Sequence, residues 1–340
     1  MIYRSKAPLR IGLAGGGTDV SPYCDLYGGA ILNVTVSLSA YATIELLNEP
    51  VIIVEALDRK EIEQHPLSSV LPINGTLDLL KGVINRIQKD YGSFQKGFRL
   101  STFVDAPAGS GLGTSSTLVV AVIGAFVEKL KLPLGDYDIA HYAFEIERND
   151  LGLAGGRQDQ YAAMFGGVNF MEFYANDKVI VNPLRIRPQY MHELENNLLL
   201  YFTASSRESA SIIKEQVKNV NDQNEKSIEA MHQLKEQARM MKEAFLKGKL
   251  DELGEILDYG FQQKRKMAAN ISNSGIEEMY NAAMKAGATG GKISGAGGGG
   301  FMIFYCPVNT RYAVADALLK FGGEVKKYSF TKYGLTTWSI

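Results

Sequence analysis

The amino-terminal part of the chain carries the pattern of β-strands. Between residues 2 and 56, apolar and polar positions alternate in several places, as at Val34, Val36 and Leu38, and glycine clusters interrupt the runs. Alternation puts successive side chains on opposite faces of a strand, so the pattern predicts strands joined by turns. Helical spacing then begins, with apolar residues at Leu77, Leu80, Ile84 and Ile87. An α+β fold is expected.

The rest of the chain mixes helices with a few strands. Strands are predicted at 98–104, 168–173, 198–203 and 301–305, with two short strands at the end. Helices are predicted after Gly113 to about Leu130, from Asp136 to Asn149 with Asp136 as the amino-terminal cap, and at 310–321. No proline lies between Pro188 and Pro307, and most of that span has helical spacing.

One stripe in this span raises the alternative of a coiled coil. Its members are spaced 3, 4, 3, 4: Met231, Leu234, Ala238, Met241 and Phe245. The stripe is short and glycines follow it, so helices packing one face on a sheet are favoured. We place a domain boundary near residues 180–195, which gives an amino-terminal domain over 1–185 and a carboxy-terminal domain over 186–340.

Composition and charge narrow the function classes. With 46% hydrophobic and 21% charged residues over 340 positions, the chain is neither disordered nor fibrous. Its 36 basic and 37 acidic side chains leave a formal charge of -1, so no global field would hold a nucleic acid. Any phosphate must be recognised locally.

The sequence predicts a cytoplasmic protein without a membrane partner. Charges occur where a signal peptide needs an apolar core, in MIYRSKAPLR. The longest apolar run, Leu118–Val127, is shorter than the roughly 20 residues that span a bilayer. Cys24 and Cys306 are the only cysteines, and we expect both to be reduced thiols.

The segment PAGSGLGTSSTLVVAV, Pro107–Val122, is the strongest candidate for chemistry. Its glycines allow tight turns and close approach to a ligand, and hydroxyl residues 114–117 stand where a helix should begin. Free amides and the positive end of the helix dipole attract phosphate there. The alternative is a turn that merely caps a buried helix. The Walker and dinucleotide-binding patterns are both absent, so a nucleotide would need another loop design.

Two further glycine segments and one charged segment accompany it. KISGAGGGGF, Lys292–Phe301, contains four consecutive glycines, which indicates close approach to a ligand or another loop, although a flexible turn is an alternative. APLRIGLAGGGTD, Ala7–Asp19, places Arg10 and Asp19 at the ends of an apolar stretch. In 143–167, charged residues stand among apolar and glycine positions, which is unusual for a plain surface helix.

The three glycine segments, in this order and separation, resemble the signature motifs of GHMP kinases. Over nearly the whole chain, GGGTD with SPY, GLGTSS, GGRQDQYAAMFGG and KISGAGGGGF closely resemble bacterial D-glycero-D-manno-heptose 7-phosphate kinases. The resemblance implies a ribosomal-protein-S5-like α/β domain followed by a ferredoxin-like, helix-rich α+β domain. It also implies an ATP- and Mg²⁺-dependent kinase that phosphorylates the anomeric C1 hydroxyl of the sugar phosphate to give a 1,7-bisphosphate, for nucleotide-activated heptose and surface lipopolysaccharide.

The resemblance also assigns catalytic roles. Asp159 would orient and deprotonate the acceptor hydroxyl, and Arg10 would stabilise the forming charge. Mg²⁺ would bind Ser115 and Glu147. The ATP loop would consist of Pro107, Gly109, Ser110, Gly111, Leu112, Gly113, Thr114, Ser115 and Ser116. For Arg10 a surface ion pair is the alternative.

The substrate contacts are expected around the first and third motifs. Galactokinases carry a Glu-His pair where this chain has Gly16 and Gly17, which argues against galactose and leaves room for a larger sugar. Substrate-binding candidates are Gly16, Gly17, Thr18, Asp19, Gly297 and Gly298. Candidates for the substrate phosphate are Arg207, which we prefer, Arg157, Arg148 and Lys6.

Two alternatives to a heptose phosphate kinase stay open. Fucose kinases, among other GHMP sugar kinases, also have a GGGTD-type motif. Some galactokinase relatives are ligand-sensing regulators without catalysis, which the presence of Ser115, Glu147 and Asp159 disfavours. The expected partner is a small phosphosugar, and the expected oligomeric state is a monomer or a homodimer.

Overall fold

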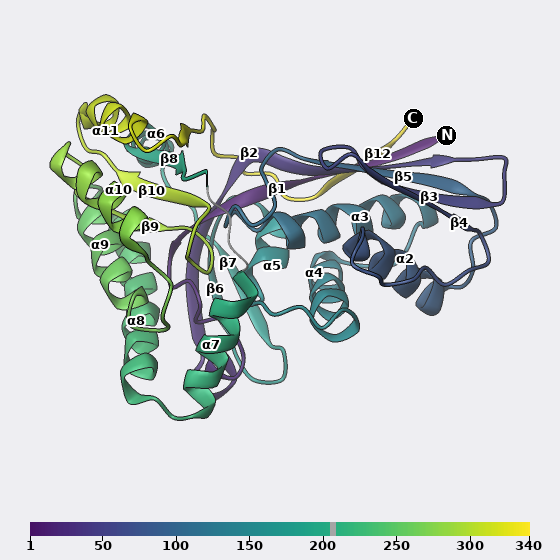
Figure 1. The fold of residues 1–340 in the computed structure, drawn as a ribbon, viewed down its shortest axis with the longest axis horizontal. Coiled ribbons are helices and arrows are strands. Elements are labelled where there is room, and N and C mark those ends of the chain that lie inside the picture. Colours follow the sequence, from purple (N-terminus) through teal and green to yellow (C-terminus); the bar gives the residue numbers. More distant parts are fainter. Residues whose placement is uncertain (205–208) are drawn as a thin grey trace.

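The computed structural model describes residues 1–204 and 209–340. It contains two sheets, each covered on one face by helices (Figure 1). The larger sheet has eight strands in the order β12-β1-β2-β5-β3-β4, with β6 pairing β2 and β7 pairing β6. The smaller has the order β11-β8-β10-β9. The expected α+β class is confirmed.

The long strand β2 organises the larger sheet. Its bounds and those of the other strands are β1 (Ile2–Ala14), β2 (Gly29–Leu46), β3 (Val51–Ala56), β4 (Glu61–Pro66), β5 (Phe98–Val104), β6 (Val168–Phe173), β7 (Val179–Pro183) and β12 (Thr336–Ser339). β2 pairs with β1 along most of its length. On its other edge, β6 pairs with the first half and β5 with the second. The first eight residues of β2 are all buried, including the polar Asn33 and Thr35, so both faces of this half of the strand are covered.

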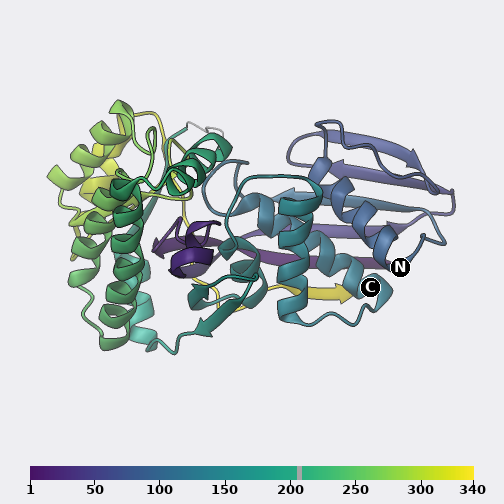
Figure 2. The same ribbon diagram turned by 90° about the horizontal axis from the view of Figure 1, so that it is seen from below.

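Helix α3 is the central helix of the layer that covers this sheet (Figures 1 and 2). The elements of the layer are α2 (Asp78–Tyr91), α3 (Thr114–Leu130), α4 (Asp136–Glu145), the π-helical turn η1 (Ile146–Asp150) and α5 (Gln158–Phe165), with the short α1 (Tyr23–Tyr27) nearby. Val119, Val122, Ile123 and Phe126 of α3 are fully buried in a core shared with β2, β3 and β5. This packing fixes the start of α3, and therefore the loop before it.

The smaller sheet lies at the other end of the molecule, beside long helices (Figure 1). Its strands are β8 (Leu198–Phe202), β9 (Gly290–Ile293), β10 (Phe301–Tyr305) and β11 (Glu324–Val325). Its helices are α6 (Pro188–Asn197), α7 (Ser209–Asn221), α8 (Glu225–Lys247), α9 (Glu252–Lys264), α10 (Ser274–Lys285) and α11 (Thr310–Leu319). The apolar stripe of α8 packs in the core with neighbouring helices and strands, as favoured over a coiled coil.

The chain changes from one sheet to the other between β7 and β8. This change supports the proposed division after residue 185. Strand β12 nevertheless returns to the larger sheet, where it pairs antiparallel with β1. The end of the chain therefore belongs to the sheet built by its beginning, and the division stays a proposal.

Most predicted elements are confirmed, and two local details differ. The helix predicted over 136–149 is α4 followed by η1, in which the backbone widens for one turn. Asp136 is not the cap of α4. Gly135 precedes the helix, and the Asp138 carboxylate accepts a hydrogen bond of 2.8 Å from the Gly135 amide. The carboxylate in the first turn thus replaces the expected cap.

Candidate active site

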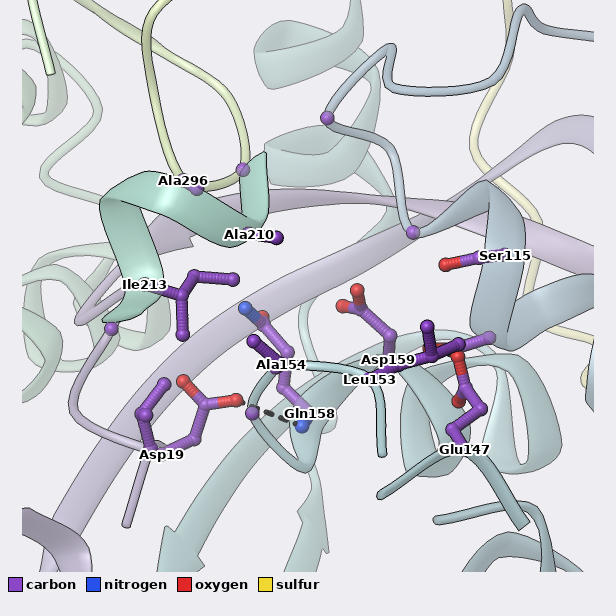
Figure 3. A pocket seen from close by; sticks show the side chains of 18 of the residues that line it. Asp19, Ser115, Glu147, Leu153, Ala154, Gln158, Asp159, Ala210, Ile213 and Ala296 are labelled. Carbon is purple, nitrogen blue, oxygen red and sulfur yellow. Dashed lines mark hydrogen bonds between the residues drawn. The ribbon is translucent and has the colours of Figure 1, made fainter. Parts of the chain in front are cut away.

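A cavity of about 570 Å³ lies where the three glycine segments meet (Figure 3). Its wall includes β1, the loop before α3, the start of α5, the loop after β9, and α7. The residues that line it include Arg10, Gly17, Asp19, Gly109, Gly111, Gly113, Ser115, Glu147, Gln158, Asp159, Lys264 and Gly295. The fold therefore brings together segments that are far apart in the sequence.

The loop before α3, residues 107–113, has the geometry of an anion site, and we call it the anion loop. Gly109, Gly111 and Gly113 have φ angles of 72°, 82° and 78°, a region that side chains other than glycine rarely adopt. No side chain caps α3, so its first-turn amides lack intrahelical partners beside the cavity. Thr114, Ser115 and Ser116 line the cavity as expected. Pro107, Ser110 and Leu112 do not, and the last two are fully buried.

The third glycine segment supports this loop from behind. Ser294 Oγ donates a 2.8 Å hydrogen bond to the Gly111 carbonyl, and the Phe301 amide donates one of 2.8 Å to the Ser110 carbonyl. A Cβ on Gly300 would lie 2.5 Å from the Ser110 oxygen. The expected close approach is therefore to another loop, and a flexible turn is the wrong interpretation.

Gly297 and Gly298 do not line the cavity with the rest of their loop. Both contact Ile271: the Gly298 amide donates to its carbonyl, and a Cβ on Gly297 would lie 2.8 Å from that oxygen. Their neighbours Gly295 and Ala296 face the cavity instead. The part of this loop that lines the cavity is thus two residues nearer the amino terminus than predicted, because the later glycines serve the packing of the loop.

The buried Arg10 and the partly exposed Asp159 form an ion pair in the cavity. Arg10 Nε and Nη2 lie 2.7 Å and 2.6 Å from Asp159 Oδ1, and Nη1 donates a 2.6 Å hydrogen bond to the Gly111 carbonyl. Arg10 is 3% exposed, which rules out the surface ion pair. Asp159 Oδ2 points toward Gly113, because a Cβ on that glycine would lie 3.2 Å from it. One carboxylate oxygen is thus held by the arginine, while the other faces the anion loop.

Glu147 is presented by the π-helical turn η1 and is 1% exposed. Its carboxylate accepts hydrogen bonds from Ser116 Oγ at 3.0 Å and Gln160 Nε2 at 2.5 Å. Burial is the largest influence on its pKa and raises it, although Arg148 acts in the opposite direction. Arg148 Nη1 lies 3.8 Å from Glu147 Oε1. A buried carboxylate is suited to a divalent cation, and the Ser115 hydroxyl also lines the cavity. In the described parts of the chain, no three His, Cys, Asp or Glu side chains gather into a metal site.

Arg86 of α2 holds the turn that carries Glu147. Its guanidinium bonds Glu145 Oε2 at 2.8 Å and Asp150 Oδ2 at 2.9 Å, at the two ends of η1. We expect Arg86→Met to lower the free energy of unfolding by about 1 to 3 kcal/mol, because charge-assisted hydrogen bonds are lost. Urea titration measures this. The control Arg59→Met removes an exposed ion pair with Glu61 and should cost less than about 1 kcal/mol. Equal losses in the two variants would contradict the role of Arg86.

Asp19 caps the start of α5 as well as facing the cavity. Its Oδ2 accepts hydrogen bonds from the backbone amides of Arg157 at 2.8 Å and Gln158 at 3.0 Å, the second of which is drawn in Figure 3. Burial is the largest influence on its pKa and raises it. Thr18, predicted to bind substrate, is fully buried, and its hydroxyl donates to the Gly15 and Ala30 carbonyls. Gly17 lines the cavity.

The predicted phosphate partners separate into different environments. Arg157 bonds Asp25, Asp177, Ser21 and the Tyr174 carbonyl, so its guanidinium is committed to the protein. Lys6 lies over the Tyr41 ring and does not line the cavity. Arg148 lines it and donates to the Gly156 carbonyl at 3.2 Å. Arg207, our preferred candidate, lies outside the described residues.

Sequence reasoning missed several residues that line the cavity, and Lys264 and Gln158 are the polar ones that matter most for its chemistry. Lys264 is the last residue of α9 and is 3% exposed. Gln158 stands between Asp19 and Asp159 (Figure 3), and its side-chain oxygen is buried without a hydrogen-bond partner. Lys264 belongs to no glycine segment, so no signal marked it. Gln158 directly precedes Asp159, and that adjacency could have marked it.

Comparison with known proteins shows which family has these segments. The family model of the GHMP kinase N-terminal domain matches residues 78–167, and that of the GHMP kinase C-terminal domain matches 241–324. A D-glycero-alpha-D-manno-heptose 7-phosphate kinase of Campylobacter jejuni is 47% identical over 99% of both chains. The chain belongs to the GHMP kinases. It is therefore a phosphotransferase with the two-domain fold of this family.

Other GHMP kinases are similar to this one to different degrees. The crystal structure of a D-glycero-D-manno-heptose 1-phosphate kinase from Bacteroides thetaiotaomicron has a TM-score of 0.85, with 46% identity and 99% coverage of both chains. The bifunctional fucokinase/GDP-fucose pyrophosphorylase of Arabidopsis thaliana is 27% identical over 88% of this chain, which covers 29% of that protein. In the described part of this GHMP kinase, no helix is long and apolar enough to cross a membrane.

Proposed function

We propose that this GHMP kinase transfers the γ-phosphoryl group of ATP to the anomeric C1 hydroxyl of D-glycero-D-manno-heptose 7-phosphate. The product would be the 1,7-bisphosphate, a precursor of nucleotide-activated heptose for surface polysaccharide. The observation that carries the proposal is the Asp159 carboxylate, held by Arg10 beside a helix start with free amides. The near full-length similarity to a heptose 7-phosphate kinase supports the choice of acceptor.

The residues present can perform the proton and charge transfers of this reaction. The acceptor hydroxyl donates its proton to Asp159, its oxygen bonds to the γ-phosphorus, and the bond from that phosphorus to the bridging oxygen breaks, leaving the electron pair on ADP. Arg10 contacts both Asp159 and the Gly111 carbonyl, so its charge would lie near the acceptor oxygen as that oxygen becomes more negative. An anomeric hydroxyl is more acidic than an ordinary alcohol, which suits a carboxylate base.

Glu147 and Ser115 fit a cation ligand set on the other side of the loop. Glu147 is buried, its pKa is raised by burial, and it lines the same cavity as Ser115. Mg²⁺, when bound, would neutralise the charge of the β- and γ-phosphates. The Ser116 hydroxyl donates a hydrogen bond to Glu147 and would thereby orient this carboxylate toward the cation.

A smaller apolar cavity of about 260 Å³ is suited to the nucleotide base. It shares Leu153 with the main cavity and is also lined by Leu118, Ile73 and Leu77. Leu118 follows Ser115 by three residues on α3, so both lie on the same face of the helix. A nucleotide whose phosphates lie on the anion loop would therefore direct its base toward these leucines.

The acceptor assay decides among the candidate sugars. The two similar heptose kinases have names that differ in the acceptor: the Campylobacter protein is named a heptose 7-phosphate kinase, and the Bacteroides protein a heptose 1-phosphate kinase. We expect ADP release with the heptose 7-phosphate to exceed release with heptose 1-phosphate, fucose, mannose and galactose. Phosphorus NMR should show the new phosphate on C1. Preferential turnover of fucose would favour a fucose kinase, and no turnover with any sugar would favour a ligand-sensing regulator.

A further inference from the structure

Lys264 is a buried ammonium group on the wall of the active-site cavity. It is 3% exposed and donates a hydrogen bond to the Gly295 carbonyl, which uses one of its three N–H donors. Within residues 1–204 and 209–340, no carboxylate forms an ion pair with it, whereas Arg10 is paired with Asp159. An unpaired buried cation is costly unless an anion joins it.

Further positive charge surrounds this lysine. A Cβ on Gly16 would lie 3.7 Å from Lys264 Nζ and 3.9 Å from Lys292 Nζ, so the two ammonium groups flank the same glycine. Lys292 is 5% exposed and donates to the Gly12 carbonyl at 2.8 Å. Burial is the main cause that lowers the pKa of Lys264, to about 8; the charge of Arg10 adds to this effect, and the charge of Asp19 opposes it. At this end of the cavity, two ammonium groups therefore stand beside one carboxylate, Asp19, which also accepts hydrogen bonds from the start of α5.

Lys264 lies at the end of the cavity away from Ser115 and Glu147, the residues proposed to bind the cation and the nucleotide phosphates. Asp19 and Ala296 lie on one side of the cavity, and Ser115 and Glu147 lie on the other (Figure 3). Lys264 bonds Gly295, next to Ala296, and adjoins Gly16 in the segment that leads to Asp19. The absence of a side chain at Gly16 leaves space beside the ammonium group.

We propose that Lys264 binds the phosphate group that the acceptor sugar already carries, and that it makes the enzyme select a phosphorylated over an unphosphorylated sugar. The proposal rests on the proposed function. A dianionic phosphate would take the two ammonium hydrogens that Gly295 leaves available and would balance the charge of Lys264 and Lys292. The acceptor would then extend from Asp159, past Asp19, to this lysine.

Binding without nucleotide tests the role of Lys264 directly. D-glycero-D-manno-heptose 7-phosphate and free heptose are titrated by calorimetry into the wild type, Lys264→Met, Lys264→Arg and Lys214→Met. We expect Lys264→Met to lose about 10- to 100-fold in affinity for the phosphorylated sugar and to bind free heptose as the wild type does. Lys264→Arg should retain part of the preference. Lys214, an exposed lysine in the adjoining cavity, controls for general attraction, and its variant should match the wild type.

Three results would overturn the proposal: no preference for the phosphorylated sugar in the wild type, a preference that survives in Lys264→Met, or equal loss for both sugars. Kinetics should show a raised KM for the sugar phosphate at unchanged kcat, and a lowered kcat alone would also overturn it. Tight phosphosugar binding that is lost in Lys264→Met, without turnover by the wild type, would refute the proposed function but support the role of Lys264 in binding the phosphate.

The melting temperature gives a check on folding. Burial lowers the pKa of Lys264, so keeping this side chain charged in the folded protein at pH 7 costs stability. The methionine variant carries no such charge and should not melt below the wild type.

Discussion

Asp159→Asn is expected to lower kcat by about 10²- to 10⁴-fold, the usual contribution of a positioned general base. The amide keeps the size of the side chain but cannot take the proton of the acceptor hydroxyl. Nucleotide affinity should stay nearly unchanged, because the loop amides before α3 do not depend on this carboxylate. Steady-state kinetics and a nucleotide titration give the two values separately.

Asp136→Asn is a matched control for this variant, since Asp136 is an exposed aspartate in the first turn of α4 and Asp159 lies in the first turn of α5. The control should retain the activity of the wild type. A parallel loss of nucleotide affinity and kcat in Asp159→Asn would show that Asp159 binds nucleotide rather than acting on the acceptor.

Glu147→Gln should weaken the binding of Mg²⁺ with nucleotide and lower kcat, yet stabilise the ligand-free protein at neutral pH. Burial raises the pKa of Glu147 above its ordinary value of 4.5, so ionisation of this carboxyl disfavours the folded state as pH rises above that value. The glutamine removes this cost. The gain in melting temperature should be present at pH 7 and should shrink as pH falls toward 4.5, where the unfolded chain also binds the proton.

Differential scanning calorimetry with and without Mg²⁺ and an ATP analogue checks both halves of this expectation. The wild type should be stabilised by the pair of ligands, and the variant much less. Glu243→Gln, at an exposed position of α8, should change neither quantity. A variant that melts lower than the wild type without ligand would show that Glu147 is needed for folding rather than held for a cation.

The sequence was most informative where the backbone itself is unusual. The glycines of the anion loop and of the third segment predicted close approach, and their φ angles and contacts account for it. The pairing of Arg10 with Asp159 spans 149 positions, and only the resemblance to a family placed the two near each other. Spacing alone contains no information about contacts at such separation.

Other features could not be read because they depend on tertiary packing. Thr18 belongs to a motif but turns inward to the Gly15 and Ala30 carbonyls. Arg157 looked like a phosphate ligand until its four partners in the protein were seen. Lys264 stands beside other basic residues at the end of α9, and nothing in the sequence shows that it is buried and bonded to the Gly295 loop. Charge in a sequence does not tell which side chains are already neutralised.

Strand β12 has a consequence for synthesis of the protein on the ribosome. β1 carries Arg10, and its outer edge is paired at Lys6 with Thr336 and through two hydrogen bonds between Ile2 and Ile340. The residues that cover this edge are made after every other strand of the larger sheet. A nascent chain must therefore keep an uncovered strand edge, which attracts the edges of other chains, until β12 has been made.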